Sequence, residues 1–240
     1  MVTTMDKLLT ELVGKLRSAN GDRLIAVILY GSAATEAGKD PFSDFNVLCV
    51  LKQVTPQELA DSEPIIRWWR EKKHPAPLLL SEEEVRTSSD CFPIEFHDIK
   101  ERHRVLHGTD VVADLTIDYS FYRAQVEHEL RAKLLRLRQK AAGVLSEKDV
   151  LLRLLAESIS TFSVLFRHAL LLSGEAAQFD KREIVKACRD KFGIDASPFL
   201  TLLDVREEKV KTRDLQPVSL FREYLKQIHV VVDAVDRMEK

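Results

Sequence analysis

The sequence predicts an α+β domain, a small mixed sheet with helices, followed by an all-α helical bundle. Up to about residue 115, short β-rich runs alternate with helical stretches, an order typical of a small sheet packed against helices. Beyond residue 115, nearly every segment has the apolar spacing of a long helix. We therefore expect one domain over residues 1–115 and a second over residues 116–240.

Apolar spacing predicts the elements of the first domain. Residues 5–18 carry apolar side chains at helical spacing and stop before Asn20-Gly21, a helix-end signal. Residues 23–30 and 45–51 are continuous apolar runs, as expected of strands buried on both faces. A helix is expected over residues 61–72, and Ser81 with Glu84 forms a capping-box signature for a brief helix. Residues 93–99 alternate between apolar and polar side chains, which predicts a third strand.

Helical stripes predict the bundle. Between residues 119 and 141, apolar side chains recur every three or four positions along one face. Residues 149–172 are apolar nearly all round, which indicates the central helix. A shorter helix over residues 181–191 is expected to end at Gly193, and a last stripe runs between residues 221 and 235. Short connections favour antiparallel neighbours.

Composition excludes several classes of protein. The 240 residues include 36 Lys and Arg against 38 Asp and Glu, so the formal net charge of -2 argues against a nucleic-acid partner or an anionic membrane. No apolar run approaches the roughly 18 residues that cross a bilayer, and the N-terminus lacks the core of a signal peptide. Three scattered cysteines without a C-x-x-C pair argue against disulfides and structural zinc, and predict a cytoplasmic protein.

One local pattern combines the residue types of a phosphate and metal site. Gly31 and Ser32 follow the first apolar strand, and Asp44 and Asn46 open the second. Glycine lets a phosphate approach the backbone closely, Ser32 adds a hydroxyl donor, and a following helix would offer free N–H groups. Because strand side chains alternate, Asp44 and Asn46 point to the same side. Two oxygen ligands beside a phosphate cradle suit a hard cation such as Mg²⁺.

This pattern resembles a known superfamily. A hydrophobic-Gly-Ser segment, a gap of 11 positions (33–43) and an Asp-hydrophobic-Asp/Glu-hydrophobic segment resemble the nucleotidyltransferases that include DNA polymerase β. The stretch GKDPFSDFNVLCVL is similar to the aminoglycoside-type members, such as the kanamycin nucleotidyltransferases, which also carry a helical C-terminal domain. The resemblance implies a third carboxylate on a later strand, and Ile94-Glu95-Phe96 fits that setting. On a strand, His97 would share the face of Glu95 and would either support the metal ligands or contribute to acceptor binding.

The resemblance also implies a reaction and a set of roles. An acceptor hydroxyl would attack the α-phosphate of a nucleoside triphosphate in line, pyrophosphate would leave, and Mg²⁺ or Mn²⁺ would neutralise charge. Gly31 and Ser32 would hold the β- and γ-phosphates. Asp44 and Glu95 would be the catalytic metal ligands, and Asn46 a neutral metal ligand or a hydrogen-bonding partner of the nucleotide. The expected partners are a nucleoside triphosphate and an unidentified acceptor, a small molecule or a protein.

Two positions depart from the family pattern. Position 46 is Asn where the family has an acid, so any metal would gain an oxygen ligand there but no charge. Ala34 and Thr35 stand where the family often has an Arg after Gly-Ser, so Lys39 is the nearest base for binding phosphate.

The alternative hypothesis is a catalytically weak or inactive protein of this fold that binds a nucleotide or a partner. A third hypothesis, an antitoxin-like nucleotidyltransferase that cooperates with helical partner domains, rests on fold analogy alone. The base preference, the general base and a homodimer stay open.

Overall fold

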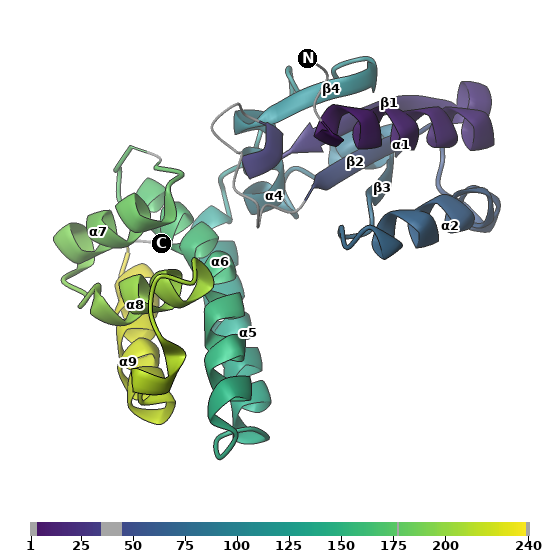
Figure 1. The fold of residues 1–240 in the computed structure, drawn as a ribbon. Coiled ribbons are helices and arrows are strands. Elements are labelled where there is room, and N and C mark those ends of the chain that lie inside the picture. The colour runs from purple at the N-terminus through teal and green to yellow at the C-terminus, as the bar shows by residue number, and fades with distance from the viewer. Residues whose placement is uncertain (1–3, 35–44, 177, 239–240) are drawn as a thin grey trace. The chain divides into compact units, whose positions relative to one another are not determined.

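The computed structural model divides the chain into two compact units, Met1–Ser120 and Phe121–Lys240 (Figure 1). The structure describes residues 4–34, 45–176 and 178–238. The first unit contains a four-stranded sheet with helices on both faces, and the second is helical, so the predicted fold class is confirmed. No helix within these ranges is both long and apolar enough to cross a membrane.

The first unit is built on a mixed sheet with the strand order β3-β2-β1-β4. The central strand β1 pairs antiparallel with β2 and with β4, whereas β2 and β3 are parallel. Its elements are α1 (Thr4–Asn20), β1 (Leu24–Tyr30), β2 (Asn46–Leu51), α2 (Pro56–Glu71), β3 (Leu78–Ser81), α3 (Glu82–Thr87), α4 (Pro93–Glu101) and β4 (His103–Gly108), with short 3-10 turns η1 (Gly21–Arg23) and η2 (Ser32–Ala34).

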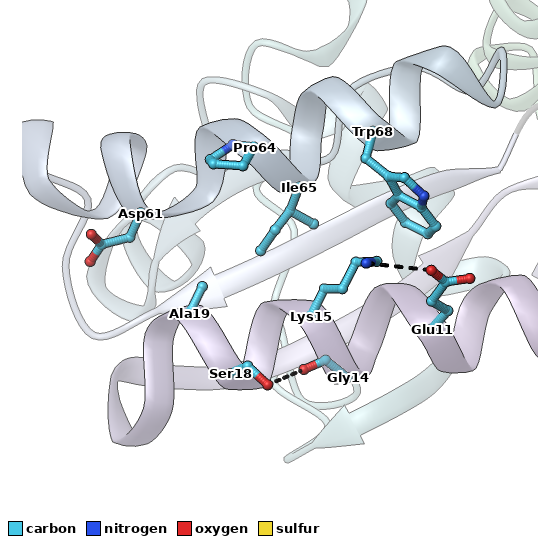
Figure 2. Close-up of a pocket in the computed structure, with 9 residues that line it drawn as sticks. All are labelled: Glu11, Gly14, Lys15, Ser18, Ala19, Asp61, Pro64, Ile65 and Trp68. Atoms are coloured by element: carbon cyan, nitrogen blue, oxygen red, sulfur yellow. Dashed lines mark hydrogen bonds and ion pairs between the residues drawn. The ribbon is translucent and has the colours of Figure 1, made fainter.

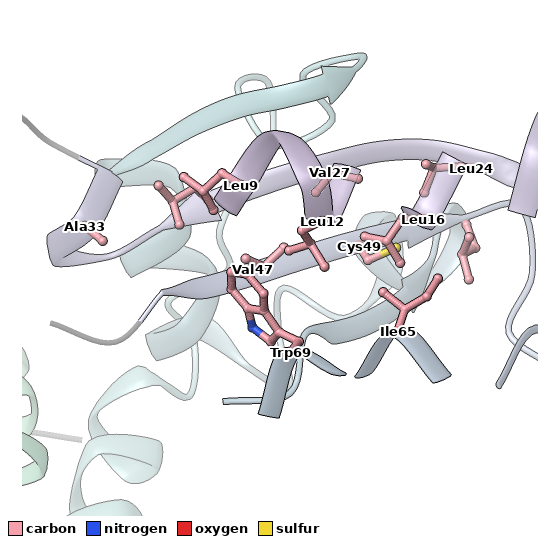
Figure 3. Close-up of a cluster of buried hydrophobic side chains, with 12 residues drawn as sticks. Leu9, Leu12, Leu16, Leu24, Val27, Ala33, Val47, Cys49, Ile65 and Trp69 are labelled. Atoms are coloured by element: carbon pink, nitrogen blue, oxygen red, sulfur yellow. The ribbon is translucent and has the colours of Figure 1, made fainter. Parts of the chain in front are cut away.

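Strand alternation divides the core of this unit between the two faces of the sheet. On one face, Val47 and Cys49 of β2 pack with α1 and with Trp69 of α2 (Figure 3). On the other face, Leu48 of β2 packs with Phe96 of α4. The continuous apolar runs of β1 and β2 are thus explained, because a strand covered on both faces needs apolar side chains in both directions.

Local capping signals start two helices. Ser81 and Glu84 form the predicted capping box of α3, with the Ser81 N–H donating to Glu84 Oε2 at 2.7 Å and the Glu84 N–H to Ser81 Oγ at 3.1 Å. Helix α2 begins five residues before its predicted start, because Thr55 and Glu58 form a second capping box and Pro56 occupies the first turn. The Thr55 N–H donates to Glu58 Oε2 at 3.1 Å.

The predicted strand over residues 93–99 is wrong, because these residues form helix α4. Pro93 is favourable in the first turn of a helix, and the buried side chains of Pro93, Phe96 and Ile99 recur every three residues. Seven residues are too few for alternation to exclude a helix. His97 is therefore two helical positions from Glu95 and does not share its face, contrary to the expectation for a strand.

The second unit is organised around one central helix. Its helices are α5 (Tyr122–Ala142), α6 (Lys148–Leu172), α7 (Lys181–Phe192), α8 (Ser197–Arg206) and α9 (Pro217–Asp236), with a 3-10 turn η3 (Thr212–Asp214). Helix α6 contacts the other four helices, as its all-round apolar sequence predicts. Gly193 ends α7 with a φ of 72°, in the left-handed region that favours glycine. Helix α8 was not predicted.

Candidate functional site

Gly31 forms a sharp turn at the end of β1. Its φ of 78° lies in the left-handed region, and its N–H donates to the Arg102 carbonyl oxygen at 2.9 Å. The Ala34 N–H donates to the Gly31 oxygen at 3.1 Å and closes the 3-10 turn η2. Ser32, the first residue of this turn, is exposed. The segment that was predicted to contact phosphate is therefore a fixed turn with an accessible serine.

The side chain of Asn46 lies beside this turn. Asn46 opens β2 and pairs with Tyr30, the last residue of β1. A Cβ atom built on Gly31 would lie 3.4 Å from Asn46 Nδ2. The absence of a side chain at Gly31 thus leaves the space next to the Asn46 amide open, and the two positions that the sequence pattern linked are neighbours in the fold.

Glu95 reaches the same face of the sheet from a helix. Helix α4 packs through Phe96 against Leu48 of β2, and Asn46 shares the face of Leu48 because it lies two residues earlier in the strand. Glu95 is exposed in the first turn of α4. Burial and, secondarily, the charge of Glu95 raise the pKa of the Tyr30 phenol, so this carboxylate is within electrostatic range of the end of β1.

Two of the predicted site residues, Lys39 and Asp44, lie outside the described residues. Of the four described ones, Gly31 and Ser32 form the turn after β1, Asn46 lies beside Gly31, and Glu95 lies on the helix that covers the same face of the sheet, not on the expected strand. The amide oxygen of Asn46, the carboxylate of Glu95 and the hydroxyl of Ser32 are oxygen groups of the hard type that Mg²⁺ prefers.

Sequence reasoning missed two neighbours of this site. Tyr30 pairs with Asn46 on one side and with His103 of β4 on the other, so three polar-tipped side chains share one row of the sheet. His103 Nε2 lies 3.0 Å from Asp110 Oδ2, and His103 Nδ1 lies 3.2 Å from the Lys100 oxygen. The position of Tyr30 at the strand end was visible in the sequence. The pairing of β4 with β1 had no local signal.

A separate open pocket of about 690 Å³ lies between α1 and α2 (Figure 2). Lys15 Nζ lies 4.9 Å from the Trp68 ring centroid and 3.4 Å from Glu11 Oε1. Helices α1 and α2 cover the opposite face of the sheet from α4. This pocket is consequently distinct from the group formed by Gly31, Asn46 and Glu95.

The comparison with known proteins supports the fold over nearly the whole chain. No protein-family model and no curated protein sequence matches it. Among solved structures, it is similar to the crystal structure of spectinomycin adenyltransferase AAD(9) from Enterococcus faecialis with ATP and spectinomycin. The similarity has a TM-score of 0.63 at 14% sequence identity, and it covers 96% of this chain and 99% of that one. The chain therefore has the fold of an aminoglycoside-type nucleotidyltransferase.

Proposed function

We propose that the protein is a nucleotidyltransferase that moves a nucleoside monophosphate from a nucleoside triphosphate to a hydroxyl acceptor. The grouping of Gly31, Asn46 and Glu95 near the end of β1 is the observation that carries this proposal. The protein shares its fold with an adenyltransferase whose structure contains ATP and spectinomycin. We propose a cytoplasmic setting, in which the free thiols Cys49, Cys91 and Cys188 would stay reduced.

Each site residue has a distinct role in this proposal. Gly31 has no side chain to block a phosphate oxygen, and the exposed Ser32 hydroxyl donates to the β- and γ-phosphates. Lys39 supplies positive charge to the same phosphates. Asp44, Asn46 and Glu95 provide oxygen ligands for Mg²⁺, which when bound neutralises phosphate charge and aligns the attacking and leaving oxygens.

Tyr30 contributes a hydrogen-bond donor beside the reacting groups. Burial and the Glu95 charge raise the pKa of its phenol above the ordinary value near 10, so the phenol keeps its proton at neutral pH. A protonated phenol can donate to a carboxylate or a phosphate oxygen. In this role Tyr30, which pairs with Asn46 across the sheet, orients the carboxylate or phosphate that accepts its hydrogen bond.

Asn46 favours a second candidate function, a nucleotide-binding or partner-binding module with little catalysis. An amide at this position adds an oxygen ligand without a negative charge, so the metal would be attracted less strongly than by an additional acid. Metal-dependent nucleotide binding without pyrophosphate release would support this function over the enzyme.

Calorimetry with ATP, GTP, CTP and UTP, each with and without Mg²⁺, tests the proposal. We expect Mg²⁺-dependent binding of at least one nucleotide, and pyrophosphate release when a hydroxyl acceptor is added, with spectinomycin tested first. Glu95→Gln should weaken the Mg²⁺-dependent part of binding, whereas Glu101→Gln, an exposed acid at the other end of α4, serves as the matched control. If no nucleotide binds, the transferase and the nucleotide-binding module are both wrong, and only a partner-binding module is left.

A further inference from the structure

Three aromatic rings meet on the face of the sheet opposite Asn46. Phe45, directly before β2, stacks on His74 with ring centroids 4.3 Å apart and an interplanar angle of 19°. Trp69 of α2 lies 4.7 Å from the His74 ring and 6.2 Å from the Phe45 ring, measured between centroids. Trp69 is fully buried and lies beside the β2 side chains in the core (Figure 3). We call Phe45, Trp69 and His74 the aromatic clamp.

The backbone around His74 is constrained on both sides. Lys73 adopts a φ of 67°, which non-glycine residues rarely do, and its N–H donates to the Arg70 oxygen at 2.9 Å. Pro75 restricts the residue before it to extended conformations. The chain thus turns sharply after α2 and is then stiffened, and this brings the His74 ring back against the helix that has just ended.

The clamp acts at the last pair of the β1–β2 ladder, Tyr30 and Asn46. Side chains alternate along β2, so anchoring the Phe45 ring on the α2 face directs Asn46 to the α4 face beside Gly31. A shift of the strand by one residue would exchange the two faces and turn the amide away. Packing of the ring therefore holds the end of the strand in the register that the preceding pairs set, at a point beyond which the described residues form no further ladder pairs.

We propose that His74 is a positioning residue: by stacking on Phe45, it fixes the start of β2 so that the Asn46 amide lies beside Gly31 on the face of Glu95. This inference rests on the proposed function for its effect on nucleotide binding, but its structural part can be measured without a ligand. His74 itself lies on the far face of the sheet and acts only through Phe45.

The test compares His74→Ala, which removes the ring, with His74→Phe, which keeps a planar ring, and with Lys72→Ala, an exposed neighbour, as the control. The first readout is the NMR signal of the Asn46 side-chain amide in the ligand-free protein. The second is calorimetric binding of ATP with Mg²⁺. We expect His74→Ala to shift the amide signal and to weaken binding by about 10-fold, the lower end of the loss seen when a direct hydrogen-bond partner of a metal ligand is removed, because His74 acts through Phe45. His74→Phe and Lys72→Ala should match the parent.

Each result decides the matter. An unchanged Asn46 signal in folded His74→Ala overturns the inference, and so does a folded His74→Phe that behaves like His74→Ala. If His74→Ala does not fold, His74→Leu takes its place, because it keeps bulk without a stacking ring. If the parent itself does not bind ATP with Mg²⁺, the proposed function fails, while the amide signal still tests the positioning role.

Discussion

The strands of the first unit are joined to one another by a different kind of bond from the helices of the second unit. Strands β1, β2, β3 and β4 are linked by backbone hydrogen bonds, so their side chains are free to cover both faces and to form a site at the strand ends. Helices satisfy their backbone groups internally, so neighbouring helices can be linked only through side chains. Tyr122 of α5 hydrogen-bonds His168 of α6, and Arg182 of α7 pairs with Asp204 of α8 at 2.6 Å.

Two groups of polar residues illustrate this difference. In α6, Arg167 and His168 are 3% and 0% exposed, and Arg167 Nη2 lies 3.2 Å from His168 Nε2. Burial lowers the pKa of Arg167 to about 10, so its guanidinium is still charged at neutral pH. In the first unit, by contrast, Ser32 and Glu95 are exposed at the candidate site. Polar residues of the helical unit thus cross-link its core, whereas those at the strand ends are accessible to a ligand.

The largest effect is expected from Phe166→Ala in the core of the helical unit. Phe166 is fully buried against Phe199, so its removal should cost about 3–5 kcal/mol of unfolding free energy. Burial raises the pKa of the Cys188 thiol to about 12 and keeps it unreactive. In the variant, Cys188 should become reactive at a lower urea concentration than in the parent, whereas the reactivity of Cys49 in the first unit should not change.

A Cys91→Ser background removes the exposed thiol from this measurement, and Val164→Ala, which is partly exposed on the same helix, provides the control. If Cys49 and Cys188 become reactive at the same urea concentration, the two units do not unfold independently, and the comparison between them fails.

Two glycines of the first unit should differ in the cost of an added methyl group. Gly108 and Gly31 have φ values of 79° and 78°, but a Cβ on Gly108 would lie 1.9 Å from the Ile25 oxygen. We expect Gly108→Ala to cost about 3 kcal/mol or more, and Gly31→Ala about 1–2 kcal/mol from its backbone conformation. Urea unfolding followed by tryptophan fluorescence measures both, because Trp68 and Trp69 lie in α2 of the first unit.

Only Gly31→Ala should also weaken binding of ATP with Mg²⁺ in the remaining folded protein. Equal losses of stability in the two variants would contradict the steric difference, and normal nucleotide binding by Gly31→Ala would remove Gly31 from the site.

A smaller effect is expected from Asn46→Asp. An acid here would add charge to a site that Glu95 already makes negative, which should lower the stability of the metal-free protein and tighten Mg²⁺ binding. If binding tightens tenfold, saturating Mg²⁺ should stabilise the variant by about 1.4 kcal/mol more than the parent. Thermal melting with and without Mg²⁺ measures this, with Ser18→Asp, at an exposed position of α1, as the charge control. An equal response of parent and variant would show that Asn46 is a sufficient ligand or no ligand at all.

The last prediction concerns stability in acid, where the change is confined to a narrow pH range. The Thr55 hydroxyl, and then Arg23 at 2.8 Å, lower the pKa of Glu58 to about 2 against the opposing effect of burial. Because the folded pKa lies below the unfolded value of about 4.3, the stabilisation is present above that value and is lost as the pH falls toward 2. The melting temperature of the first unit should therefore fall over this range, and less steeply in Glu58→Gln.

Tryptophan fluorescence reports this transition, since both tryptophans lie in the first unit. The same substitution should leave the helical unit, followed through Cys188 at neutral pH, unchanged. A melting temperature of Glu58→Gln with the same acid dependence as the parent would show that other carboxylates dominate.

Local signals in the sequence were sufficient for much of the fold. The apolar runs predicted β1 and β2, the Ser81–Glu84 pair predicted the start of α3, and Gly193 predicted the end of α7. Each signal acts within one or two turns of chain, where propensity and capping chemistry decide the outcome. The sequence pattern also linked Gly31 with Asn46, and the pairing of Tyr30 with Asn46 makes these two positions neighbours.

Tertiary structure alone decided which element brings Glu95 to the site. Residues 93–99 are short enough to fit either period, and packing of Phe96 and Ile99 against the sheet favours the helix α4. The row that joins Asn46, Tyr30 and His103 depends on the pairing of β4 with β1, which is remote in sequence. The stack of Phe45 on His74 likewise joins residues 29 positions apart. Such contacts depend on the free energy of packing distant segments together, which no local pattern of residues encodes.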